Sequence, residues 1–341
     1  MKSALEIIDR FKRGPRDIVG IDIGTTATKV VRIRTTGSET TVIGAAILPV
    51  VELSAYLNGE EVPSFIVPPK LKARSVAIAC TAQSAVVKLL SFPGAFDDRN
   101  AGKLVRNLGL DDPDRFRIGF KVVTEGQGRQ ESRILAVAIP EVEAAIPVKL
   151  FPSGIPAPNS IEVSGLASMS AFLKTATEHS DGGLGVIEFG ATTSTYALFN
   201  RGVLALVRRF SFGSNMLLEK VAQSLGVDVE TAQGIVSDGS FDISAAVSDV
   251  MQPLIKQLMV SRDFVERREN CRITQMYVSG GLANSHDSLN SLRQAMDLEV
   301  HFWNPFDGLT VAKDAIGSEL TGREWQFSAA IGACLATFEE T

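Results

Sequence analysis

Residues 17–33 read DIVGIDIGTTATKVVRI, and this pattern indicates the fold class of the chain. An apolar strand runs up to Asp22, a turn rich in threonine begins at Gly24, and a second apolar strand follows. Residues 40–50 continue as a third strand, so the segment predicts an antiparallel meander. A carboxylate, Asp22, therefore stands where the first strand meets the turn.

A second copy of this pattern occurs at residues 184–199, which read LGVIEFGATTSTYALF. Superimposing Asp22 on Glu188 also aligns Gly24 with Gly190. A third strand follows here too, at 202–212. The chain therefore contains an internal repeat, the feature that organises a fold most directly. The alternative is two unrelated hairpins with glycine turns.

Turns of this composition are suited to binding phosphate. Glycine lets the backbone approach an anion closely, and successive N–H groups of a turn form an anion-binding nest. Threonine hydroxyls add neutral donors, and a carboxylate at the strand end suits Mg²⁺, which is held through one or two carboxylates and phosphate oxygens. Two such turns on two lobes predict a clamp around one polyphosphate.

A third glycine turn, SGGLA, occupies residues 279–283. We expect it to follow a buried strand at 273–278 and to precede a helix at 285–296 and a strand at 299–303. A Gly-Gly step at this place lets a base or ribose lie against backbone and exposes a helix N-terminus to phosphate. Taken alone, the same tripeptide is also a common turn.

Composition excludes several classes of protein. The chain has 341 residues, which favours about two domains, and 34 Lys+Arg against 39 Asp+Glu give a formal net charge of −5, which does not favour nucleic acid. No apolar run reaches the roughly 18 residues of a membrane helix, and the charged start does not resemble a signal peptide. Three separated cysteines and three histidines without ligand spacing predict reduced thiols and no structural zinc. We expect a soluble, cytoplasmic protein.

DIGTTATK, GATTS, SGGLA and the strand end VHFWNPF at 300–306 together resemble the actin-like ATPase superfamily. Within it, the chain is most similar to the PilM-like type IV pilus assembly proteins, which are related to FtsA, and the likeness extends over residues 17–339. The resemblance implies an α/β fold of two duplicated RNase H-like lobes with a small α+β subdomain inserted in the first.

The same resemblance implies the domain plan. The expected parts are an N-terminal basic segment at 1–16; a first lobe at 17–73, 161–182 and 318–341; an inserted subdomain at 74–160; and a second lobe at 183–317. Two connecting helices, 161–172 and 327–336, are rich in small residues, which suits close packing at a hinge, or simply two buried helices. The N-terminal segment is expected to be a fraying helix or, as the alternative, a membrane-surface contact.

The resemblance also implies the site: ATP or ADP with Mg²⁺. The expected contacts to phosphate or nucleoside are Asp22, Gly24, Thr25, Thr26, Lys29, Gly190, Thr192, Thr193, Gly213, Gly280, Gly281 and Leu282. Asp22 and Glu188 are the expected metal ligands, and Glu162 and Glu188 the candidate catalytic residues. Glu162 is assigned to orienting an attacking water, the alternative being a surface or strand-end glutamate.

Three features depart from the family pattern. The second carboxylate is Glu188 rather than aspartate, Ser214 follows Gly213 where a second glycine is usual, and Gln233 and Val236 stand where the family offers a charged pair. A displacement of about 1 Å can reduce a rate ~100-fold, so we expect binding of nucleotide with at most weak hydrolysis.

The function that the resemblance implies is a scaffold at the inner face of the cytoplasmic membrane. It would dock the cytoplasmic N-terminal tail of a PilN-like inner-membrane protein in a groove between the first lobe and its inserted subdomain, and contact the pilus assembly motor of a pilus or related secretion machine. No nucleic acid is expected. An actin-fold small-molecule kinase and an FtsA-like filament-forming protein are the alternatives.

Overall fold

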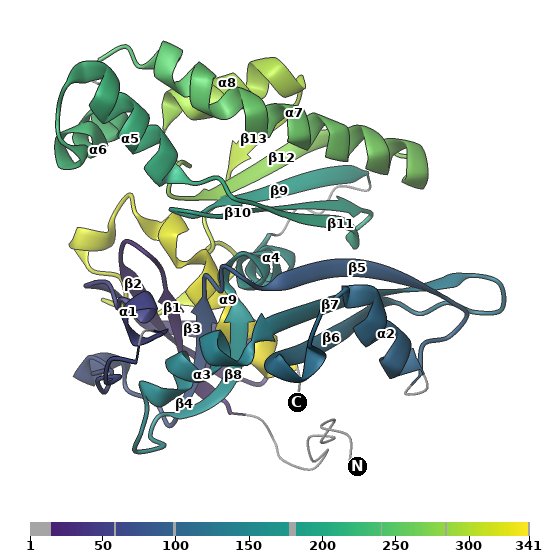
Figure 1. Cartoon of the computed structure of the whole chain (residues 1–341). Helices are drawn as coiled ribbons and strands as arrows, with labels where there is room; N and C mark the ends of the chain where they lie inside the picture. Colours follow the sequence, from purple (N-terminus) through teal and green to yellow (C-terminus); the bar gives the residue numbers. More distant parts are fainter. Residues whose placement is uncertain are drawn as a thin grey trace.

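The computed structural model describes residues 15–57, 59–97, 100–176, 182–239, 241–283 and 285–339. Two lobes, each built on one β-sheet, lie one above the other, and a smaller sheet lies beside the lower lobe (Figure 1). Within the described ranges, no helix is both long and apolar enough to span a lipid bilayer. The N-terminal segment predicted at residues 1–16 lies almost wholly outside these ranges, because the first described residue is 15.

The sheet of the first lobe is built on the apolar run at the start of the described chain. β1 (Asp17–Ile23), β2 (Thr28–Thr36) and β3 (Glu39–Leu48) form the antiparallel meander that the sequence predicts. β4 (Ser75–Cys80) pairs in parallel with β1, and β8 (Ala157–Val163) pairs in parallel with β4. β1 and β4 lie inside the sheet and are buried on both faces, which explains their continuous rather than alternating apolar sequences.

The sheet of the second lobe repeats this arrangement. β9 (Gly183–Phe189), β10 (Ser194–Asn200) and β11 (Val203–Phe210) form the meander, and β12 (Ile273–Gly280) and β13 (Glu299–Phe302) add in parallel. Its strand order, β11-β10-β9-β12-β13, matches the order β3-β2-β1-β4-β8 of the first lobe. The internal repeat read from the sequence is therefore confirmed as a duplicated sheet.

Two helices pack against each other between the lobes. α4 (Ser164–Thr175) follows β8, and α9 (Ser328–Glu339) ends the described chain. Gly332 of α9 lies against the Ala167 carbonyl of α4 so closely that any β-carbon would overlap it. The small residues predicted in these two helices therefore serve a close helix crossing at the centre of the molecule.

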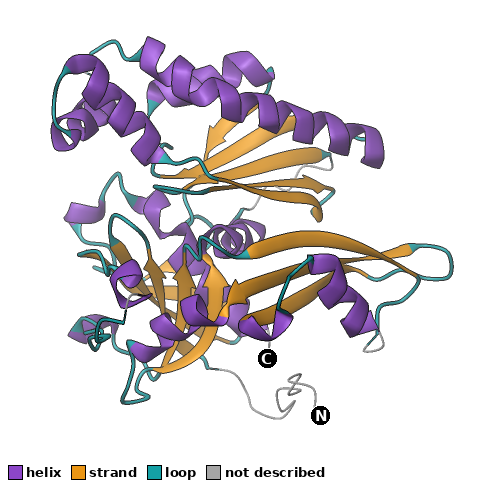
Figure 2. Cartoon of the chain, viewed as in Figure 1, coloured by secondary structure: helices purple, strands orange, loops and turns teal. Residues whose placement is uncertain are grey.

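Helices cover the outer face of the second-lobe sheet, as Figure 2 shows. They are α5 (Ser214–Leu225), α6 (Val229–Asp238), α7 (Ser244–Glu269) and α8 (His286–Met296). Their buried side chains join those of the sheet in the largest apolar cluster of the described residues. This packing fixes the sheet edge from which the second glycine turn projects.

The inserted subdomain has its own three-stranded sheet, in the order β5-β7-β6. The strands are β5 (Val86–Pro93), β6 (Phe116–Thr124) and β7 (Glu131–Pro140), and one face is covered by α2 (Ala101–Leu108). α3 (Glu141–Lys149) leads back towards the first lobe, where α1 (Leu53–Leu57) also lies. The α+β character expected of this segment agrees with the structure.

The sheets divide the chain differently from the boundaries expected for the inserted subdomain. β4 and β8, both placed wholly or largely within residues 74–160, belong to the sheet of the first lobe. The chain also returns to that lobe before residue 318, because β14 (Thr310–Val311) pairs with β3. These pairings join strands far apart in sequence, which local pattern does not reveal.

Candidate functional site

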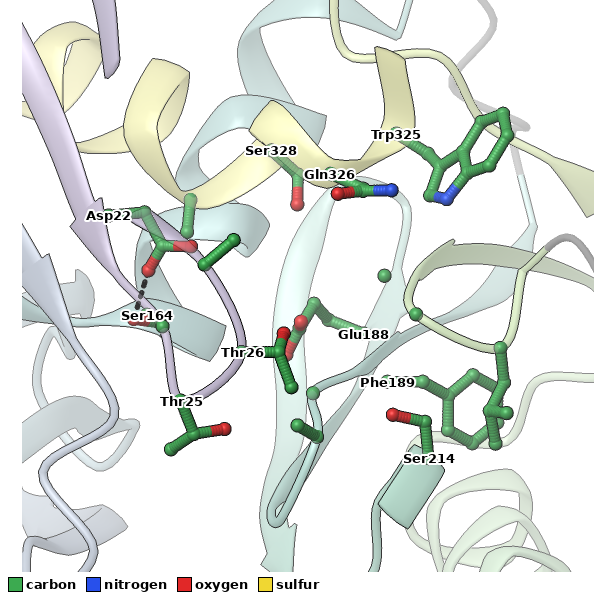
Figure 3. Close-up of a pocket in the computed structure, with 18 of the residues that line it drawn as sticks. Asp22, Thr25, Thr26, Ser164, Glu188, Phe189, Ser214, Trp325, Gln326 and Ser328 are labelled. Carbon is green, nitrogen blue, oxygen red and sulfur yellow. Dashed lines mark hydrogen bonds between the residues drawn. The ribbon is translucent and has the colours of Figure 1, made fainter. Parts of the chain in front are cut away.

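A cavity of about 570 Å³ lies between the two lobes. Residues of both glycine turns line it, together with residues from the start of α4, from the turn after β12 and from the segment before α9. In Figure 3, Asp22, Thr25 and Thr26 approach from the first lobe, and Glu188, Phe189 and Ser214 from the second. Ser328, Gln326 and Trp325 stand along a third side.

The first turn places a buried carboxylate at the end of β1. Asp22 is 6% exposed, its Oδ2 lies 3.8 Å from Nζ of Lys29, and Ser164 donates a hydrogen bond of 2.7 Å to its Oδ1. Burial raises the pKa of Asp22, while the charge of Lys29 and the Ser164 hydroxyl act in the opposite direction. Lys29 lies directly across from Asp22 on β2, which brings the two together.

The second turn holds Glu188 at the corresponding position, near the end of β9. No described residue forms a hydrogen bond with the carboxylate of Glu188, and Glu188 lines the cavity. Burial, and then the like charge of Asp22, raise its pKa from 4.5 to about 8, although Lys29 and Arg209 partly oppose this. At neutral pH the carboxyl of Glu188 is therefore largely protonated when no cation is bound.

Backbone contacts hold the second turn in shape. The Gly190 amide donates to the Thr193 carbonyl at 3.1 Å, and the Ser214 and Asn215 amides, at the start of α5, donate to the carbonyls of Gly190 and Ala191 at 3.0 Å each. A β-carbon on Gly213 would overlap the backbone of Ala191. Gly213 thus supports the turn from behind, and its neighbour Ser214 lines the cavity.

The turn after β12 approaches the second lobe's turn just as closely. Gly280 has a positive φ of 84°, and a β-carbon there would overlap the Phe189 carbonyl. The amide of Gly281 donates to that carbonyl at 2.6 Å. Only glycine fits this conformation and this approach, which exposes the backbone of Gly280 and Gly281 to the cavity.

Most of the residues expected at the site line this cavity. They are Asp22, Gly24, Thr25, Thr26, Lys29, Glu188, Gly190, Thr192, Thr193, Gly280, Gly281 and Leu282. Glu162 and Gly213 are not among the lining residues. The structure brings the rest to one cleft from segments up to about 260 residues apart, but their individual roles remain predictions.

Glu162 lies on β8 rather than on the connecting helix where it was expected. The helix begins two residues later, at Ser164, and Ser164 is the residue that reaches the cleft. Ser160, on the same face of β8 as Glu162, contacts Thr337 of α9. The negative charge of Glu162 likewise contributes to raising the pKa of Cys334 on that helix. Its position gives no support to a role in orienting water.

Sequence reasoning missed several residues of the cleft. Ser164 and Arg209 reach it from the first connecting helix and from the third strand of the second meander, and Arg323, Trp325 and Gln326 from the segment before α9. The repeat itself offered a signal for Arg209, since the third strand of each meander runs beside the turn. Nothing local distinguishes the 323–326 segment from an ordinary loop.

The donor set suits Mg²⁺ bound together with phosphate. Asp22 and Glu188 border the same cavity, and the Glu188 carboxyl, which accepts no hydrogen bond from a described residue, could serve as a ligand once it loses its proton. Among the described residues no group of three or more His, Cys, Asp or Glu side chains could hold a metal ion alone. One or two carboxylates completed by phosphate oxygens and water is the usual arrangement for this ion.

One solved structure supports the fold, and two others show a weaker likeness. A PilM–PilN type IV pilus biogenesis complex matches with a TM-score of 0.76 and 19% identity, covering 95% of this chain and 99% of that chain. The ethanolamine utilization protein EutJ from Carboxydothermus hydrogenoformans matches with a TM-score of 0.44 and 15% identity, covering 94% and 90%. MreB 5 of Spiroplasma citri bound to AMPPNP gives 0.46 and 9%, covering 95% and 97%.

Comparison with curated protein sequences found no match. A family model described as type IV pilus assembly protein PilM matches residues 160–338, which is more than half of the chain. The matched region runs from β8 through the second lobe to α9, so it includes the second turn and the Gly-Gly turn. The actin-like fold expected from the sequence is confirmed, and the chain belongs to the PilM family of type IV pilus assembly proteins.

Proposed function

We propose that this chain is a nucleotide-binding scaffold of a type IV pilus or related secretion machine. The observation that carries the proposal is that two duplicated glycine-threonine turns border one cavity from opposite lobes. A triphosphate or diphosphate between them would meet backbone N–H groups and threonine hydroxyls on both sides. ATP or ADP is the expected ligand, with the nucleoside towards Gly280, Gly281 and Leu282.

Mg²⁺ would be held by Asp22 and Glu188 and by phosphate oxygens. When bound, it would neutralise phosphate charge and attract one carboxylate from each lobe. Glu188 must lose its proton to serve as a ligand, so binding of Mg²⁺ is coupled to release of a proton. Affinity for the magnesium complex is therefore expected to rise with pH up to about 8.

Hydrolysis is expected to be weak or absent. Ser164 occupies the start of α4, beside Asp22, and is a poor general base because its hydroxyl donates to that carboxylate. Glu162, which the sequence predicts to orient the attacking water, does not line the cavity and lies on the face of β8 that contacts α9. Nucleotide would then act as a conformational ligand that favours the closed arrangement of the lobes.

The proposed partner is the cytoplasmic tail of a PilN-like inner-membrane protein. A PilM–PilN complex is among the solved structures that match this chain, with a TM-score of 0.76 over 95% of its length. An extended tail would bind between the first lobe and the inserted subdomain. This would hold the scaffold at the cytoplasmic face of the inner membrane, within reach of the assembly motor.

The nucleotide proposal is tested by isothermal titration of the full chain with Mg-ATP and Mg-ADP. We expect saturable binding, and Asp22→Asn should weaken it on the order of 100-fold, because the substitution removes a charged metal ligand. Asp17→Asn is the matched control, since Asp17 lies on the same strand but pairs with Arg32 and Arg34 away from the cavity. Titrations of wild-type protein without heat or thermal shift would overturn the proposal.

The partner proposal is tested separately by fluorescence anisotropy with a labelled synthetic tail of the PilN-like protein. Binding at micromolar concentration is expected, and a scrambled tail of the same composition is the control. Absence of binding at high micromolar concentration would count against docking of the tail, whatever the result with nucleotide.

A further inference from the structure

Arg209 of β11 ties the second lobe to the entrance of the inserted subdomain. Its Nη1 donates to the Ala85 carbonyl at 2.9 Å, and its Nη2 donates to the carbonyls of Thr81 and Ala82 at 2.7 and 3.1 Å. One guanidinium thus holds three backbone carbonyls of the segment 81–85. The planar fork of arginine is suited to such multiple contacts, and lysine cannot reproduce them.

The segment 81–85 is the first crossing from the lobe into the inserted subdomain, between β4 and β5. Ala82 has a positive backbone φ of 41°, a conformation that residues other than glycine rarely adopt. The segment is therefore held in a specific turn. Gln83 donates a hydrogen bond of 3.4 Å to the hydroxyl of Thr192, in the second glycine turn. The entrance therefore contacts the second lobe at two points, one of them a residue that borders the nucleotide cavity.

Arg209 also belongs to the wall of that cavity. The register of the second sheet sets Glu188 opposite Thr195, and Thr195 opposite Arg209, so these three residues form one row across β9, β10 and β11. Side chains in such a row lie on the same face of a sheet. The Nε of Arg209 is buried and has no acceptor among the described residues, so the contacts of this guanidinium are made by Nη1 and Nη2.

The inserted subdomain is tied to the second lobe at a further place. β5 and β11 lie side by side (Figure 1). Arg133 of β7 forms an ion pair of 2.7 Å with Glu269 at the end of α7, and Arg268 donates to Ser91 of β5 at 3.3 Å. The inserted subdomain therefore has contacts to both lobes, and a movement of one lobe relative to the other must strain or shift it.

We infer that Arg209 couples occupancy of the cavity to the placement of the inserted subdomain. The inference rests on the proposed nucleotide binding, and it says how that binding would control the position of the inserted subdomain. Polyphosphate between the turns draws the second lobe towards the first, and Arg209 and Thr192 carry the segment 81–85 with it. Coupling of this kind is reciprocal, so a ligand of the inserted subdomain would change affinity for nucleotide by the same factor.

The test is hydrogen exchange of the full-length protein, followed in peptides that cover residues 81–93. Arg209→Lys is the variant, because it keeps the positive charge and removes the fork. Arg208→Lys is the matched control: Arg208 is the neighbouring residue, and it donates instead to Ser261 of α7. Each protein is measured alone and with saturating Mg-AMPPNP, at a concentration set by its own titration.

Without nucleotide, exchange in these peptides should be about ten-fold faster in Arg209→Lys than in wild type, and unchanged in Arg208→Lys. With Mg-AMPPNP, wild type and Arg208→Lys should gain several-fold protection there, and Arg209→Lys should gain none. Equal protection in Arg209→Lys and wild type, or no change on binding to wild type, would overturn the inference while leaving nucleotide binding intact. A wild-type titration without heat would remove the proposed function and this inference together.

Discussion

The two glycine turns occupy equivalent places in duplicated sheets, yet their charges are arranged differently. In the first lobe, the row across the meander is Asp22, Lys29 and Ile47, with the cation on the middle strand. In the second lobe, the row is Glu188, Thr195 and Arg209, with the cation on the third strand. In the first lobe the cation therefore lies on the strand next to the carboxylate. In the second lobe the cation lies two strands away from the carboxylate.

Because of this difference, the side chains beside the two turns make different contacts. In the first lobe, Lys29 and Ser164 satisfy Asp22 within the cleft. In the second lobe, the guanidinium of Arg209 is bonded to backbone carbonyls of the segment 81–85, and the Glu188 carboxyl is left protonated. Duplication preserved the geometry of the turns, but burial raises the pKa of both carboxyls, and only Asp22 has a cation on the adjacent strand and a hydroxyl donor to oppose it.

The largest expected effect comes from removing the titration of Glu188. Because the pKa of Glu188 is about 8 in the folded chain and 4.5 is its ordinary value, the folded state keeps its proton where the unfolded state has lost it. The free energy of unfolding of wild type should therefore fall between about pH 4.5 and 8, by roughly 1.4 kcal/mol for each unit of pKa. Glu188→Gln lacks this slope, and thermal melts from about pH 5 to 9 measure the difference.

At about pH 5 the two proteins should have similar stability, and at about pH 9 the variant should be the more stable by several kcal/mol. Asp22 titrates in both proteins and its charge acts on Glu188, so the comparison measures the titration of Glu188 together with this coupling. Parallel pH profiles for wild type and Glu188→Gln would show that the second turn is as well compensated as the first.

The repeat made most of the fold predictable from the sequence. A carboxylate, a glycine and a threonine-rich turn between apolar strands recur at the same spacing, and both copies fold into the same strand order. Assigning β4 to the inserted subdomain failed because its parallel pairing with β1 spans more than 50 residues, and apolar runs of such strands look alike. β14 contains only two residues, too few to produce a periodic pattern.

The site was predictable where it depends on local turn chemistry. Gly280 and the two threonine turns could be recognised from the sequence because their composition is typical of close backbone approach, and in the structure Gly280 lies directly against the Phe189 carbonyl. For Arg209 the repeat indicates only the strand on which it lies, because its acceptors are more than 120 residues away and meet it only when the inserted subdomain packs on the second lobe. The placement of Glu162 failed by two residues, since the strand continues to Val163 before the helix begins.

A smaller effect is expected from adding a methyl group to each turn. In Gly190→Ala the new β-carbon would lie 2.5 Å from the Thr193 carbonyl oxygen, which is fixed by the turn. In Gly24→Ala it would lie 2.9 Å from the Ala27 carbonyl oxygen and 3.0 Å from Nζ of Lys29, a flexible side chain. We expect Gly190→Ala to lower the free energy of unfolding by about 2 kcal/mol and Gly24→Ala by about 1 kcal/mol.

Urea unfolding of the two variants measures this pair, and titration with Mg-ADP shows whether the loss extends to binding. A larger loss in Gly24→Ala than in Gly190→Ala would mean that the first turn, rather than the second, is the more rigid of the two.

The smallest effect concerns the serine that begins a helix at each side of the cleft. Ser164 is the first residue of α4 and donates to Asp22, whereas Ser214 is the first residue of α5, lines the same cavity, and makes no side-chain hydrogen bond to another described residue. Ser164→Ala should lower the free energy of unfolding by about 1 kcal/mol and raise the pKa of Asp22 further, because the ionised carboxylate loses a donor. Ser214→Ala should change the stability by less than about 0.5 kcal/mol. Urea unfolding at neutral pH measures both, and a loss in Ser214→Ala as large as that in Ser164→Ala would contradict the assignment of a completed hydrogen-bond network to the first lobe alone.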